Sequence, residues 1–151
     1  MSELTRYQIY QLLNRDYEGL WLVNIDLTEA RLRQASLRNA NLSGAILRGA
    51  DLRGVDLSYA NLKGADLTGA DLSYANLEAA ELQTARLDNA NLVGANLQEA
   101  SFVCTRLQGA AVFEEQLAQA KSLRGTALPD STMLSEHDWE WEAEFEEWCK
   151  S

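Results

Sequence analysis

The chain has 151 residues, of which 46% are hydrophobic, and this suffices for one domain with a buried core. Its formal net charge is −10, but residues 113–151 contribute −7 of it, whereas residues 25–112 contribute only −2. A nearly neutral body with an acidic tail has no basic field for phosphate groups, so direct binding to nucleic acid or to an anionic membrane is not expected.

Targeting signals and paired cysteines are also missing from the sequence. The first residues lack the uninterrupted apolar run of a signal peptide, and nowhere do the ~18 apolar residues that a membrane helix needs follow one another. The two cysteines, Cys104 and Cys149, lack the spacing of a disulfide framework or a zinc site. We therefore expect a cytoplasmic protein with free thiols.

Residues 1–19 carry the signals of a short helix. Ser2 is suited to cap its start, and Gly19 marks a break at its end. Apolar residues at helical spacing lie between them, namely Ile9, Leu12 and Leu13. Because the first coil of a solenoid needs cover, the sequence predicts an N-terminal helical cap here.

Residues 20–112 repeat with a period of five. A large apolar residue stands at every fifth position from Leu22 to Leu107, in eighteen consecutive repeats, and a small residue, nearly always Ala, stands two positions earlier. Asp or Asn often stands between the two, where a short polar side chain favours turn chemistry. These residues are Asp26, Asn41, Asp51, Asp56, Asn61, Asp66, Asp71, Asn76, Asn91 and Asn96.

This period fits neither a helix nor a flat strand. Five residues rotate about 500° in an α-helix, and in a strand every second leucine would point to the opposite face. The leucines share one interior only if the chain turns a corner in each repeat, which is a solenoid. The Gly, Ser, Thr, Asn and Tyr residues that follow the leucines are corner residues.

The pattern A-(D/N)-L-x-x over residues 20–112 resembles the pentapeptide-repeat family. The resemblance implies an all-β solenoid, a right-handed quadrilateral β-helix with four repeats per coil. About four to five coils follow, in a rod ~20 Å long at ~4.8 Å per layer. Some repeats depart from the pattern at the Asp/Asn position, but these residues are expected to face outward: Ile46, Glu81, Arg86, Arg106 and Ala111.

Residues 113–130 are predicted to form a C-terminal helical cap. Glu114 and Glu115 suit a first turn, and Leu117 and Ala120 would face the rod. Glycine and proline act as stops near the end of the segment. The segment resembles the short helix that follows the repeats in many cyanobacterial members of the family.

Residues 131–151 form an acidic, tryptophan-rich tail. The stretch 135–148 has seven acidic residues and no Lys or Arg. As a helix it places aromatic residues on one face, and as a strand it alternates aromatic residues with glutamates; the helix is favoured by its composition. The candidate interaction residues are Trp139, Trp141, Phe145 and Trp148. They either cap the last coil, the favoured interpretation, or dock onto a partner.

Outward residues twenty positions apart should stack on one side of the rod. Arg31 then lies under Asp51, Asp71 and Asn91, and the next column runs through these residues: Arg33, Arg53, Ser73 and Val93. Such a column is either a solvated surface or a partner patch. Tyr59 and Tyr74 are interpreted as corner residues.

No constellation for catalysis is found. The single histidine, His137, has no nucleophile beside it in sequence, and no glycine-rich phosphate loop is present. We therefore predict no catalytic, cofactor or metal residue. The hypothesis is a non-enzymatic protein–protein interaction or scaffold module, a monomer or weak homodimer, whose protein partner is unidentified. The alternative comes from the family resemblance: a DNA-mimicking protein that binds DNA gyrase or topoisomerase and protects it from quinolones.

Overall fold

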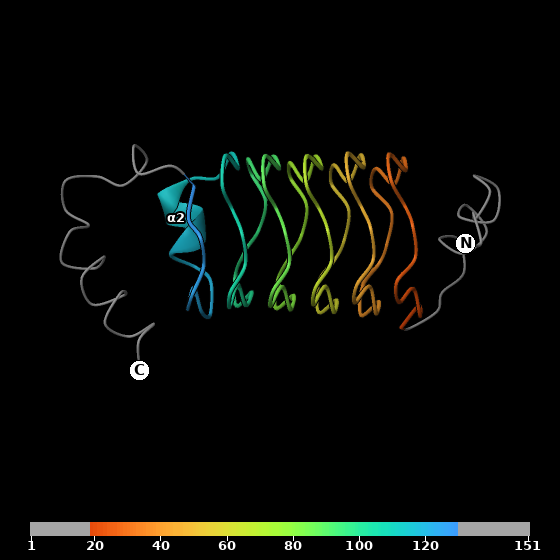
Figure 1. Cartoon of the computed structure of the whole chain (residues 1–151), viewed down its shortest axis with the longest axis horizontal. Coiled ribbons are helices and arrows are strands. Elements are labelled where there is room, and N and C mark those ends of the chain that lie inside the picture. The colour runs from red at the N-terminus through yellow and green to blue at the C-terminus, as the bar shows by residue number, and fades with distance from the viewer. Residues whose placement is uncertain (1–18, 130–151) are drawn as a thin grey trace.

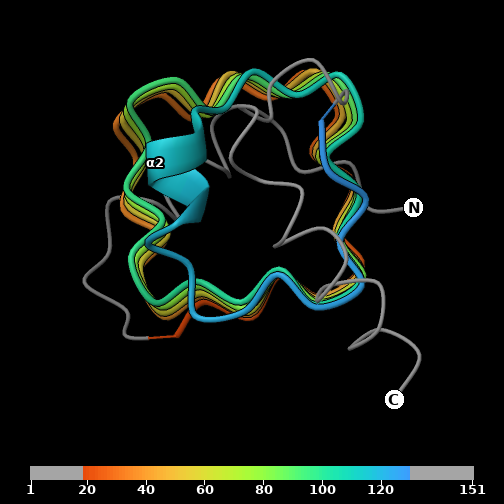
Figure 2. The same cartoon turned by 90° about the vertical axis from the view of Figure 1, so that its left-hand side faces the viewer.

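The computed structural model describes residues 19–129, which wind into a rod of stacked coils (Figure 1). Seen along the rod, the coils superpose in a four-sided outline (Figure 2). The predicted N-terminal cap, except for Gly19, and the acidic tail lie outside the described residues.

Parallel backbone bridges join residues twenty positions apart. Asn41, Asn61 and Glu81 follow one another in one such column. The N–H of Leu62 donates to the carbonyl of Glu81 over 2.7 Å, and the N–H of Glu81 donates to the carbonyl of Ala60 over 2.9 Å. A spacing of twenty with a repeat of five gives four repeats per coil, as predicted.

We name the four sides of the rod by their inward leucine positions. Face A contains Leu22, Leu42, Leu62, Leu82 and Phe102. Face B contains Leu27, Leu47, Leu67, Leu87 and Leu107. Face C contains Leu32, Leu52, Leu72, Leu92 and Val112. Face D contains Leu37, Leu57, Leu77 and Leu97.

A tight turn forms each corner. The N–H of Ala65 donates to the carbonyl of Leu62, three residues back, over 3.0 Å, and the same bond recurs along the rod. The third residue of the turn has a positive φ in every repeat from Asn24 to Gly109, as in a type II turn. Glycine adopts this conformation without strain, whereas Tyr74, at φ 58°, is held there by the ladder above and below it.

Leucine and alanine fill the interior. Leu62 and Leu67 are 0% exposed, and burial of each leucine contributes about 1.5–3 kcal/mol. Two threonines stand where the repeat has Ala, and both hydroxyls are satisfied. The Thr105 hydroxyl donates to the carbonyl of Leu82 over 2.7 Å, and the Thr126 hydroxyl donates to the carbonyl of Phe102 over 2.5 Å.

The C-terminal segment differs from the predicted helix over 113–130. Helix α2 spans only Glu114–Leu117, although Leu117 and Ala120 do pack against the core. The chain then returns to the ladder, where Ser101 pairs with Ser122 and Arg106 pairs with Ala127, now twenty-one residues apart. A longer helix would leave buried N–H groups of the preceding coil without acceptors, so ladder pairing prevails over helix propensity.

Gln116 bridges the gap that α2 opens in the ladder. In the preceding coil, the carbonyl of Ala75 accepts the backbone N–H of Asn96 over 2.9 Å. The corresponding carbonyl of Ala95 accepts the side-chain Nε2 of Gln116 over 2.9 Å, and the same nitrogen donates to the carbonyl of Leu92 over 2.7 Å. A side-chain amide therefore replaces the missing backbone rung.

Candidate interaction surface

The ten Asp and Asn residues of the repeats are structural. In each case Oδ1 accepts the backbone N–H two residues further on, at 3.0–3.4 Å. Where that second residue is Ser or Thr, its hydroxyl often donates to the same oxygen, as Ser73 does to Asp71 over 2.7 Å. The predicted turn chemistry is confirmed, and these carboxylates serve the corners.

Two of these carboxyls have a shifted pKa. Hydrogen bonds from the hydroxyl and the N–H of Thr28 lower the pKa of Asp26. Burial tends to raise the pKa of Asp66, but the Thr68 hydroxyl and N–H and the Arg48 guanidinium together lower it. Both groups therefore stay ionised below the pH at which a free aspartate takes up a proton.

Ion pairs link successive coils diagonally. Arg48 Nε lies 2.6 Å from Asp66 Oδ2, and Lys63 Nζ lies 2.6 Å from a carboxylate oxygen of Glu81. In both pairs the base follows a leucine and the acid precedes the corresponding leucine of the next coil. The acidic side chains in these pairs are therefore neutralised locally.

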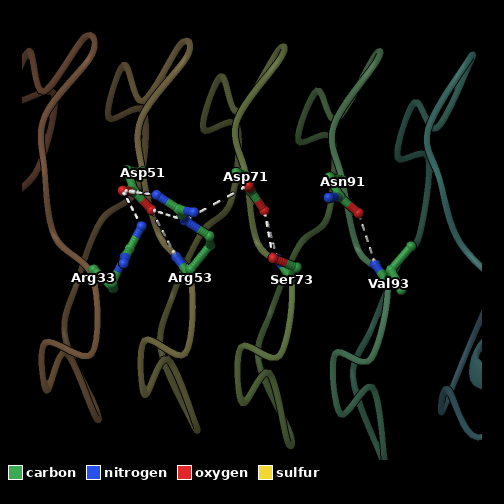
Figure 3. A network of polar contacts seen from close by, with 7 residues as sticks. All are labelled: Arg33, Asp51, Arg53, Asp71, Ser73, Asn91 and Val93. Atoms are coloured by element: carbon green, nitrogen blue, oxygen red, sulfur yellow. Dashed lines mark hydrogen bonds and ion pairs between the residues drawn. The ribbon is translucent and has the colours of Figure 1, made fainter.

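The N-terminal half of face C carries the densest charge network (Figure 3). Arg53 contacts Asp51 at 2.6 Å and Asp71 at 3.8 Å, and Arg33 approaches Asp51 at 3.5 Å. Arg31 is exposed and stacks under Asp51, yet among residues 19–129 it forms no ion pair. Three arginines thus face two aspartates, which leaves this half of the face with positive charge.

The C-terminal half of face C is apolar. Val93 continues the column of Arg33, Arg53 and Ser73 (Figure 3), and Phe113, 57% exposed, stands twenty residues further on, where α2 begins. At the adjoining corner, Tyr74 is 73% exposed. A Cβ added to Gly94 would lie 2.6 Å from the Tyr74 ring, so the ring lies against the next corner.

Glycine borders this face on both sides. We define the face C surface as the outward residues of this side together with Tyr74: Arg31, Arg33, Asp51, Arg53, Asp71, Tyr74, Ser73, Asn91, Val93, Ala111 and Phe113. The corners beside it contain Gly49, Gly69 and Gly109 with Glu29 and Asn89 on one side, and Gly54 and Gly94 with Gln34 and Tyr74 on the other. The five glycine positions have no side chain, so an extended partner can approach the surface closely there.

Other exposed features are smaller. The Arg38 guanidinium lies 5.0 Å from the centre of the Tyr59 ring, which is a cation–π contact. Tyr59 is at the corner between faces D and A, away from face C. On face B, Asp88 lies between Arg86 at 3.7 Å and Arg106 at 3.3 Å. Trp21, 76% exposed, lies in the first coil of face A.

The predicted site residues Trp139, Trp141, Phe145 and Trp148 lie outside the described residues. Cys104 is a free, exposed cysteine at a corner. Within residues 19–129, no group of His, Cys, Asp and Glu is suited to hold a metal ion. The only helix in that range, α2, is far too short to cross a membrane.

The apolar half of face C was not predicted from the sequence. Tyr74 is a corner residue, as predicted, but its exposure was not foreseen, and the second column was followed only as far as Val93. Phe113 stands twenty residues after Val93, and Ala111 stands twenty residues after Asn91, so the twenty-residue period contained the signal.

The stacked four-sided coils define the protein as a β-helix solenoid, and comparison with known proteins gives its family. A family model described as pentapeptide repeats matches eight copies, over residues 21–58, 50–89 and 80–112. The chain therefore belongs to the pentapeptide-repeat family, and its fold is a right-handed β-helix.

Solved structures agree with this assignment. HetL, a pentapeptide repeat protein involved in regulation of heterocyst differentiation in the cyanobacterium Nostoc, is 34% identical with a TM-score of 0.54; the match covers 76% of this chain and 62% of HetL. A pentapeptide repeat protein of the thylakoid lumen of Arabidopsis thaliana is 26% identical with a TM-score of 0.50, covering 68% of this chain and 74% of the other.

A quinolone-resistance protein is also among the structures that resemble this chain. Full-length QnrB1, a plasmid-mediated fluoroquinolone resistance protein, is 17% identical with a TM-score of 0.42, covering 85% of this chain and 69% of QnrB1. This similarity is too low to bear on function. Comparison with curated protein sequences gave no match.

Proposed function

We propose that this protein is a non-enzymatic interaction module whose rigid rod presents the face C surface to a protein partner. The observation that carries the proposal is the division of that surface into an arginine-containing half and an exposed apolar half. Aromatic and arginine side chains are the types that dominate the energetics of protein interfaces.

The rigidity of the rod supports a binding role. Each coil is hydrogen bonded to its neighbours and has a fully buried leucine core, so the outward side chains are held at fixed spacings. The described aspartate carboxylates of the repeats are used in turns and ion pairs, which favours binding over catalysis. We also propose that the protein acts in the cytoplasm.

Gyrase protection is the weaker function. A DNA mimic needs a continuous acidic surface, but acids along this rod alternate with bases in pairs such as Arg48–Asp66 and Lys63–Glu81. A supercoiling assay with purified gyrase checks this point. Inhibition, or protection from a quinolone, at micromolar protein would restore the alternative.

The proposal is tested by capturing partners with two variants of the tagged full chain. Phe113→Ser on the face C surface should abolish recovery of specific partners, because it removes an exposed aromatic side chain from the apolar half of that surface. Trp21→Ser removes a comparably exposed aromatic residue from face A and should leave recovery unchanged. Equal recovery with both variants would refute face C as the docking surface.

A further inference from the structure

We propose that the acidic, aromatic segment 135–148 of the same chain binds to the face C surface as a helix and competes there with the protein partner. This inference rests on the proposed function, since it names the chemistry that the surface recognises. The segment has both required properties: aromatic residues at helical spacing and seven acidic residues with no Lys or Arg.

The chain leaves the described rod beside face C. Ala127 pairs with Arg106 on face B, so residue 129 is in register with Gln108, next to the corner at Gly109. That corner leads from face B to face C. Residues 130–134, which extend up to about 17 Å, are sufficient to pass the corner.

The length of the segment fits the surface. A helix of fourteen residues is about 21 Å long. The column from Phe113 back to Arg33 spans four coil spacings, or about 19 Å. Running from the C-terminal end of the rod toward its N-terminal end, the helix would cover the whole face C surface.

The order of side chains fits as well. Trp141 falls about 9 Å along the helix, level with Tyr74. Phe145 and Trp148, on the same side of the helix, fall at about 15–20 Å, level with the arginines Arg53 and Arg33, whose guanidinium groups can lie over aromatic rings. Glu144 falls at about 14 Å, level with Arg53.

Face C is the side that suits such a segment. Face B has equal numbers of arginines (Arg48, Arg86, Arg106) and aspartates (Asp26, Asp66, Asp88) among its outward residues. Face D has one arginine (Arg38) against two acids (Asp56, Glu78). Face C, with three arginines against two aspartates and exposed aromatic side chains, therefore suits an acidic helix better than faces B and D do.

Tryptophan fluorescence of the full chain tests the proposal. In a Trp21→Phe background the remaining tryptophans all lie in the tail. We expect their emission to be blue-shifted and shielded from acrylamide. Arg53→Glu should remove the shielding, and Arg53→Glu with Glu144→Arg should restore it.

The matched control is Arg48→Glu on face B, whose arginine also pairs with an aspartate at 2.6 Å. It should leave the shielding unchanged. Equal effects of Arg53→Glu and Arg48→Glu, or exposed tail tryptophans in the Trp21→Phe protein, would overturn the proposal. Circular dichroism verifies that each variant is folded.

Disulfide trapping gives a readout that is independent of fluorescence. In a Cys104→Ser background, Arg33→Cys on face C should form an intramolecular disulfide with Cys149 on mild oxidation, and Thr28→Cys on face B should do so much more slowly. Disulfides between chains would assign the surface to a second copy, and equal rates would mean that the tail is not docked; either result overturns the proposal. If Phe113→Ser still abolishes partner capture, the proposed function survives that failure.

Discussion

At the scale of single residues, the leucine at the centre of each repeat and the aspartate before it have opposite roles. The leucine is inside and supplies the driving force for folding, whereas the aspartate is at the surface and organises a turn. Substitutions at the two positions should therefore differ strongly in their effect on stability.

Leu62→Lys should unfold the protein. Leu62 is 0% exposed in the middle of the rod, and the buried ammonium group would have no polar partner there. The measurement is thermal unfolding followed by circular dichroism, with Leu62→Met as the control, expected to lose less than about 1.5 kcal/mol. Melting of the lysine variant within a few degrees of the wild type would contradict the buried ladder.

Asp66→Asn should be nearly neutral at pH 7 but should flatten the acid dependence. Asn keeps the turn bond to Thr68 and loses the partly exposed ion pair with Arg48, worth about 0.2–1 kcal/mol. Because the pKa of Asp66 is lowered in the folded state, its ionised form stabilises the protein above the unfolded value of 3.8, and this contribution is lost as the pH falls below it.

Melting temperatures between pH 6 and pH 2 measure this effect. The wild type should lose stability more steeply than Asp66→Asn below about pH 4. Parallel curves for the two proteins would show that Asp66 does not contribute to acid sensitivity.

At the scale of elements, α2 is a short interruption of the ladder that depends on one side chain. Gln116 satisfies two carbonyls of the preceding coil and also accepts the N–H of Phe113 over 2.8 Å. The stability of the last coil therefore depends on an amide that the repeat itself does not contain.

Gln116→Leu should destabilise the C-terminal coil. It keeps the side-chain size but leaves two carbonyls without the amide donor, at about 1–3 kcal/mol. Hydrogen exchange should accelerate at Cys104, whose N–H donates to Arg124, and much less at Leu62 in mid-rod. Gln119→Leu, on an exposed position, is the control; equal effects of the two changes would exclude the bridging role.

At the scale of the whole molecule, the question is what the tail contributes to the rod. Phe102 and Leu107 donate their N–H groups to Ser122 and Ala127, so a further layer of chain already follows them. A tail that caps the rod would have to cover this layer, residues 121–129, and not the leucines before it.

Deleting residues 131–151 should lower the melting temperature by only a few degrees, because each coil takes its stability from its neighbours. Differential scanning calorimetry of the deleted and full-length chains makes the measurement. A large loss of stability, or association of the shortened chain, would favour the end-capping interpretation of the tail.

The period of five was enough to predict a solenoid with inward leucines and the turn role of residues such as Asp71, whereas the four repeats per coil came from the resemblance to the pentapeptide-repeat family. It could not predict the extent of α2, since Glu114 and Leu117 carry helical signals while the ladder decides where the helix ends. The apolar group of Tyr74, Val93 and Phe113 was missed for a related reason: these residues become neighbours only through the spacing of twenty, which is a property of the coil and not of the single repeat.

The single extra residue in the last coil also limits the end-to-end addition of one rod to another. A stack of identical coils exposes backbone groups at its end that another rod could extend, and rods joined in this way would form a filament. Here the carbonyls of Leu92 and Ala95 are occupied by Gln116, and the pairing beyond α2 is shifted to twenty-one residues. A second rod therefore meets an end that it cannot match on all sides, so the length of the particle is set by its sequence and not by its concentration.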